Sequence, residues 1–105
     1  MLDQKLLYMS KFGELIDVEI PVLLDFFAVD EQSHSMHAIL RDVAAALGDK
    51  AKVIKIDVAK NKELAEALRV KNLPTLIIYK NGEMKWRQTG TQDSDTLIGL
   101  IQEYV

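Results

Sequence analysis

The fold is decided by the stretch PVLLDFFA, residues 21–28, which is an almost unbroken run of apolar residues. Such a run is typical of a β-strand covered on both faces, as in a sheet that lies between two layers of helices. The stretch KVIKIDV, residues 52–58, is rich in β-branched residues and alternates in part, so it predicts a second strand. We therefore expect a covered sheet built around these two segments.

A helix is expected between the two strands. Its apolar residues recur with the period of an α-helix and share one face: Met36, Ile39, Leu40, Val43 and Leu47. Gly48 follows the last of them and suits the position after a helix, where φ is positive. A strand, a helix of this length and a second strand predict a right-handed βαβ unit whose strands are parallel.

The second half of the chain predicts a short helix and a hairpin. The helix covers residues 61–70, with Asn61 as its N-cap, and a strand follows over residues 74–80. Asn81-Gly82 is a strong hairpin signal, because both central residues of a type I′ turn need a positive φ. The second strand of this hairpin covers residues 83–89.

The two ends of the chain complete the pattern. A last helix begins near Ser94, with Asp93 or Ser94 as its cap, and its inner side is lined by Leu97, Ile101 and Tyr104. A short apolar piece at residues 6–9 precedes one or two helical turns around residues 12–16. Together the elements predict a single α/β domain over residues 1–105, with a mixed sheet of four or five strands between two helical layers.

Composition excludes several kinds of chemistry. The chain contains no cysteine, which excludes disulfides, thiol redox cycling, cysteine-ligated zinc and iron–sulfur clusters. The net charge of −3 gives no reason to expect nucleic acid, and no apolar run reaches the roughly 18 residues that a membrane-spanning helix needs. The start of the chain shows no secretory signal, so we expect a cytoplasmic protein without a cofactor or metal. The basic stretches are interpreted as a solvated face: Lys60-Asn61-Lys62, Lys71, Lys80, Lys85 and Arg87.

Several short motifs, each weak alone, occur in an order and at intervals that resemble the thioredoxin family. They are DFFA at residues 25–28, LPT at residues 73–75 and KNGE at residues 80–83, followed by Gly90 after the last strand. The resemblance covers nearly the whole chain and is to thioredoxins of the bacterial type. It implies a thioredoxin fold, with a central mixed sheet, four flanking helices and a cis-proline at Pro74.

The chain departs from this family at the redox site. The family carries WCGPC soon after the first of these motifs, where this chain reads VDEQSHSM at residues 29–36. The alignment is one residue short, so either Asp30 and Ser33 or Glu31 and His34 stand at the two thiol positions. Both choices exclude the family's reaction, because a thiolate is the nucleophile in thiol–disulfide exchange.

Asp25 lies in the most apolar run of the chain, and the resemblance implies a buried carboxylate there that serves proton transfer to the deeper thiol. Burial without a partner raises the pKa of a carboxyl group, because it disfavours the charged form. Since the chain has no thiol to serve, we interpret Asp25 as a relic or a structural acid, hydrogen-bonded to water or to Lys55 on the neighbouring strand. Glu31, His34 and His37 offer too few converging ligands for a metal site.

The resemblance also implies a peptide-binding rim. In the family, the residue before the cis-proline offers its backbone N–H and C=O groups to an extended peptide, and this contact needs no thiol. Carried onto this chain, the rim comprises Val29, Asp30, Ala59, Asn72, Leu73, Pro74, Thr89 and Gly90. We therefore expect a redox-inactive, non-catalytic domain that binds a protein or an extended peptide, as an adaptor, a chaperone-like factor or an assembly partner.

Two alternatives stay open. An enzyme of different chemistry would use Asp25, Glu31 and His34 at the former redox site. A structural, homo-oligomeric module would join through Trp86, the only tryptophan, which strand alternation places in phase with Met84 and Gln88. Alternation does not decide whether the Trp86 ring fills the core or forms an exposed patch.

Overall fold

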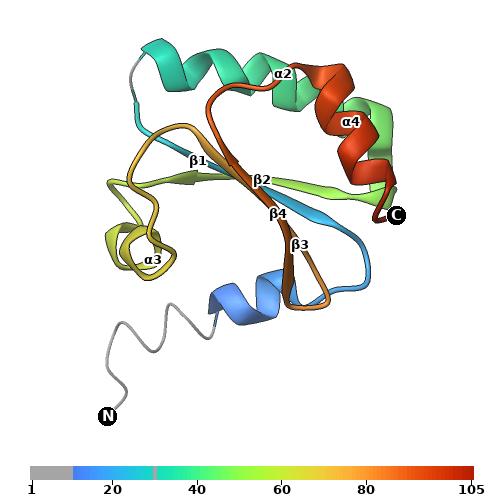
Figure 1. The fold of residues 1–105 in the computed structure, drawn as a ribbon, viewed down its shortest axis with the longest axis horizontal. Coiled ribbons are helices and arrows are strands. Elements are labelled where there is room, and N and C mark those ends of the chain that lie inside the picture. Colours follow the sequence, from blue (N-terminus) through green and yellow to red (C-terminus); the bar gives the residue numbers. More distant parts are fainter. Residues whose placement is uncertain (1–10, 30) are drawn as a thin grey trace.

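The computed structural model describes the chain over residues 11–29 and 31–105, and helices cover both faces of its central sheet (Figure 1). Residues 11–16 are helical, whereas the apolar piece expected at residues 6–9 lies outside the described residues. The elements that follow are β1 (Val22–Phe27), α2 (Glu31–Leu47), the 3-10 helix η1 (Gly48–Lys50), β2 (Lys52–Asp57), α3 (Lys62–Ala67), β3 (Thr75–Lys80), β4 (Glu83–Thr89) and α4 (Ser94–Gln102).

The sheet has four strands within the described residues, in the order β2-β1-β3-β4. β1 and β2 are parallel because α2 carries the chain back between them, whereas β3 runs antiparallel to both β1 and β4. The mixed sheet and the parallel pair expected from the sequence are therefore confirmed. No helix in the described part of the chain combines the length and the apolar composition that crossing a membrane requires.

Each face of the sheet packs against its own pair of helical elements (Figure 1). On one face, the apolar stripe of α2 meets Leu97 and Ile101 of α4, and every member of the stripe is buried except the half-buried Ile39. On the other face, Phe12 and Ile16 of the helical segment join Leu64 of α3. β1 lies between the two layers, which explains why residues 22–26 are completely buried.

The local turn signals act as the sequence predicts, except around α3. Asn81 and Gly82 both have a positive φ, of 54° and 78°, and join β3 to β4 as a tight turn. α3 is shorter than residues 61–70, because Arg69 adopts a φ of 56° and ends the helical run. Asn61 stands at the N-cap but forms no capping bond, since its side-chain amide donates to the Asp57 carbonyl at 2.9 Å instead.

An irregularity in the hairpin settles the position of Trp86. Trp86 pairs with Ile78, but the register then shifts, so that Tyr79 pairs with Met84. The two side chains therefore lie on opposite faces, and the expected phase of Trp86 with Met84 is wrong. The Trp86 ring is half-buried and packs against the core beneath α2 and α4, whereas Met84 is 45% exposed.

Candidate functional site

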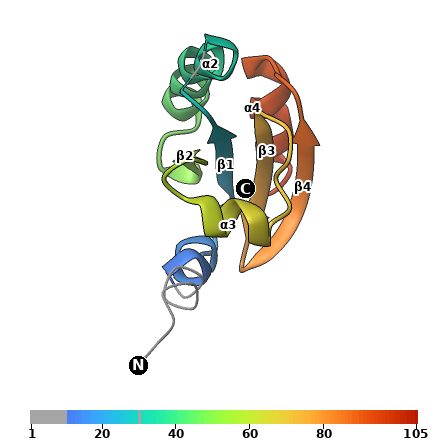
Figure 2. The same ribbon diagram turned by 90° about the vertical axis from the view of Figure 1, so that its left-hand side faces the viewer.

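Four strand ends meet at one edge of the sheet. Phe27 on β1 lies opposite Asp57 on β2, Phe26 lies opposite Thr75 on β3, and Thr75 lies opposite Thr89 on β4. Neighbouring strands are about 4.8 Å apart, so the residues just beyond these ends form a row. Figure 2 looks onto this edge, with the strands side by side in the order β2, β1, β3, β4.

This row contains most of the rim that the sequence predicts. Backbone hydrogen bonds join neighbouring segments of this row. The Val58 N–H donates to the Phe27 carbonyl at 2.9 Å, and the Gly90 N–H donates to the Pro74 carbonyl at 2.8 Å. Asp30 lies outside the described residues. The described residues at or beside this edge are Val29, Ala59, Asn72, Leu73, Pro74, Thr89 and Gly90.

The turn before β3 presents open backbone groups at this edge. The Leu73–Pro74 peptide bond is cis, Pro74 is buried, and Leu73 is half-buried. The Asn72 carbonyl accepts a hydrogen bond from the Thr75 hydroxyl at 2.5 Å, which holds the turn in place. Neither the N–H nor the C=O of Leu73 bonds to any residue that the structure describes. Within the described residues, these two groups therefore have no partner.

An exposed apolar residue, Val29, follows the strand next to β3. This strand is β1, and the Val29 side chain is 74% exposed, which is the highest value among the large apolar residues described. Ala59 and Thr89, at the ends of the flanking strands, are also exposed. An exposed apolar side chain beside open backbone donors and acceptors is the arrangement that an added peptide strand uses.

Asp25 lies below this edge and is completely buried. Neither of its carboxylate oxygens has a hydrogen-bond partner among the described residues. Burial raises the pKa of Asp25 from its ordinary 3.8 to about 6, and the positive charge of Lys55 opposes that increase. Lys55 is the register neighbour of Asp25 on β2, but the expected hydrogen bond between them is absent, and the exposed Lys55 side chain extends toward α2.

The former redox positions lie at the start of α2. Glu31, Ser33 and His34 belong to its first turn, but their side chains lie outside the described residues. Which pair replaces the thiols, and whether Glu31 and His34 converge on Asp25, therefore stays a prediction. His37 packs its ring edge-on against Phe27, with ring centroids 4.7 Å apart. No group of three metal-ligating side chains occurs in the described part of the chain.

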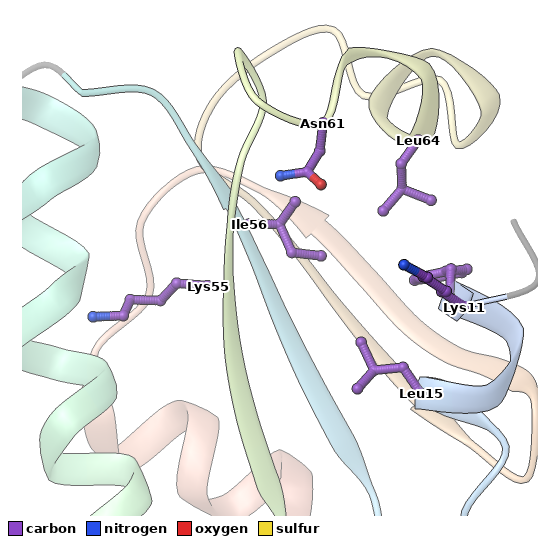
Figure 3. Close-up of a pocket in the computed structure, with 7 residues that line it drawn as sticks. Lys11, Leu15, Lys55, Ile56, Asn61 and Leu64 are labelled. Carbon is purple, nitrogen blue, oxygen red and sulfur yellow. The ribbon is translucent and has the colours of Figure 1, made fainter. Parts of the chain in front are cut away.

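A separate hollow of 390 Å³ lies between the helical segment, β2 and α3, where sequence reasoning expected no site (Figure 3). Its walls come from elements that are distant in sequence, so no local motif indicates it. The Lys55 side chain extends away from the hollow toward α2, and the Asn61 amide is already bonded to the Asp57 carbonyl. The lining is Lys11, Phe12, Leu15, Lys55, Ile56, Asn61 and Leu64, which offers no converging acid–base pair.

Comparison with known proteins agrees with this architecture. The family model described as Thioredoxin matches residues 4–103. A chloroplastic thioredoxin Y from Oryza sativa subsp. japonica is 40% identical over 95 residues, covering 89% of this chain and 56% of that protein. The chain thus spans little more than half the length of that relative.

Solved structures give the same result. A mutant thioredoxin from Halobacterium salinarum is 31% identical with a TM-score of 0.79, covering 90% of this chain and 83% of that one. The malaria parasite's thioredoxin-2, described as a component of its protein secretion machinery, is 33% identical with a TM-score of 0.76, covering 80% and 82%. The chain belongs to the thioredoxin family and has the thioredoxin fold, but its 105 residues contain no cysteine and so lack the thiol pair of that family.

Proposed function

We propose that this chain is a redox-inactive, non-catalytic thioredoxin-family domain that binds an extended segment of a partner protein at the rim. The observation that carries the proposal is the pair of open backbone groups at Leu73 beside the exposed side chain of Val29. An extended segment that bonds to both groups continues the hydrogen-bonding pattern of the sheet edge, while Val29 contacts its side chains. This binding requires no thiol.

A relative supports an assembly or adaptor role for such a domain. Thioredoxin-2 of the malaria parasite is described as a component of a protein secretion machinery. A member of this fold therefore works as part of a larger protein assembly in at least one case. Because a fold does not determine a function, this precedent supports the kind of role and does not identify the partner.

The proposal is tested by capture of proteins from a lysate of the encoding organism, using the full chain as bait. Val29→Asp and Leu73→Asp each place a charge on the rim, and we expect both to lose the same set of captured proteins. Val29→Asp is the cleaner variant, because Val29 is 74% exposed whereas Leu73 also packs against the core. Identical capture by the wild type and both rim variants would contradict the proposal.

Met84→Asp is the matched control. Met84 is an apolar residue that is 45% exposed, and it lies near the start of β4, at the end of the sheet opposite the rim. We expect this variant to capture the same proteins as the wild type. Urea unfolding followed by Trp86 fluorescence shows whether each variant is folded, and an insulin-reduction assay is expected to show no turnover with any of them.

A further inference from the structure

The connection between β2 and β3 carries an excess of exposed positive charge. Four of its side chains are exposed cations, whereas Glu66 is its only exposed acid. The other acid, Glu63, is half-buried and has one carboxylate oxygen out of contact with solvent. The cations are Lys60, Lys62, Arg69 and Lys71. Because the whole chain has a net charge of −3, this segment is distinct from its average surface.

These cations are available to a partner. None of the four forms an ion pair with a carboxylate that the structure describes. The ion pair found among the described residues joins Lys85 and Glu83 on β4. Asp57, three residues before Lys60, accepts the Ala59 N–H at 2.9 Å. No ion pair therefore joins these cations to Glu63 or Glu66.

Both ends of the charged connection adjoin the rim. Lys60 directly follows Ala59, and Lys71 precedes Leu73 by two residues. The connection thus leaves the sheet at the end of β2 and returns at the start of β3. These two strands flank β1, the strand that Val29 follows. Figure 2 shows α3, at the middle of this connection, in front of β1 on the side that faces the viewer.

We propose that the segment bound at the rim carries acidic side chains on the side that faces α3, next to an apolar residue over Val29. This inference rests on the proposed function and names the chemical class of its partner. Carboxylates placed there meet Lys60 and Lys71, which fixes the orientation of the segment and accelerates its association. A neutral or basic segment gains no such contact and leaves the four cations uncompensated.

The first experiment selects partners without assuming any one of them. A phage library of random 12-residue peptides is panned on the full chain, and the recovered clones are sorted by whether Val29→Asp also captures them. We expect the clones that depend on Val29 to be enriched in Asp and Glu relative to the starting library. Clones that depend on Val29 but show no acidic enrichment overturn the charge inference and leave the proposed function standing. A complete absence of such clones overturns both.

The second experiment measures the charge contribution with an enriched peptide made synthetically. The double variant K60E/K71E is compared with the control K50E/K52E, which changes the net charge equally at exposed lysines on the far end of β2. We expect the rim double variant to bind about five- to tenfold more weakly, and the control to bind within about twofold of the wild type. Equal weakening in both variants would show a non-specific charge effect and overturn the inference.

Discussion

Replacing the buried acid of β1 by its neutral isostere, Asp25→Asn, is expected to stabilise the protein above pH 6. Asp25 is completely buried, and neither carboxylate oxygen has a described partner. Above pH 6 the wild type therefore holds an ionised carboxylate in an apolar site. The asparagine side chain has nearly the same shape and is never ionised, so it avoids the cost of desolvating a charge.

The magnitude follows from the two pKa values. Burial raises the pKa of Asp25 from 3.8, its value when exposed, to about 6 in the folded protein. Between these values the folded state binds more protons than the unfolded state, so the free energy of unfolding falls as the pH rises. The difference between the two pKa values corresponds to about 3 kcal/mol of unfolding free energy. This stabilisation is present below roughly pH 4, is lost between roughly pH 4 and pH 6, and is absent at every higher pH.

The assay is urea unfolding of both proteins at several pH values from 3.5 to 8, followed by the fluorescence of Trp86. We expect the gain in unfolding free energy from Asp25→Asn to be larger by about 3 kcal/mol at pH 8 than at pH 3.5. Asp42→Asn, which neutralises an exposed acid on α2, serves as the control for net charge. Parallel pH profiles for the wild type and Asp25→Asn would refute the reasoning, as would a difference that shrinks as the pH rises.

Four further substitutions test contacts and backbone conformation elsewhere in the fold and the influence of Lys55 on Asp25. Lys55→Met removes the charge that lowers the pKa of Asp25, so NMR should show this carboxyl titrating above pH 6 in the variant. Arg87→Met removes donors to the Leu68 and Arg69 carbonyls, at 2.6 and 2.9 Å, and should lower the free energy of unfolding by about 1–2 kcal/mol; an unchanged urea midpoint would contradict this. Gly82→Ala places a side chain at a φ of +78° and should lower the free energy of unfolding by about 1 kcal/mol. The Cβ added by Gly99→Ala, within α4, meets no atom within 4 Å, so this variant should raise the free energy of unfolding by up to about 1 kcal/mol; thermal unfolding measures both changes.

The elements around the sheet are predictable from the sequence because their signals are local. Residues 22–26 are apolar in succession apart from Asp25, as is typical of a strand covered on both faces, and all five are completely buried. The stripe from Met36 to Leu47 has the period of a helix, and Asn81-Gly82 supplies two residues that tolerate a positive φ. The rim follows from the same reasoning, since strand ends that share an edge bring their loops together.

The errors arise where two local preferences compete or where a contact spans the sheet. Asn61 is a suitable N-cap residue, but its side-chain amide donates to the Asp57 carbonyl and forms no capping bond. Strand alternation fails for Met84 because one residue of β4 is left unpaired between the residues that pair with Ile78 and Tyr79. A single extra residue moves the side chains that come before it to the opposite face of the sheet. The hollow beside α3 leaves no sequence signal, because its walls converge only in the folded chain.

The Asp25→Asn variant also distinguishes a relic from a structural acid at this buried position. A structural acid in a core is hydrogen-bonded, as nearly all buried polar groups are. Asp25 has no partner among the described residues, and its raised pKa means that the ionised form lowers stability at neutral pH. The ionised carboxylate therefore does not stabilise the fold at neutral pH, and the Asp25→Asn variant decides between a relic and a structural acid. A relic requires Asp25→Asn to gain stability and still capture the same proteins, whereas a gain in stability with a loss of capture would assign the carboxylate to binding.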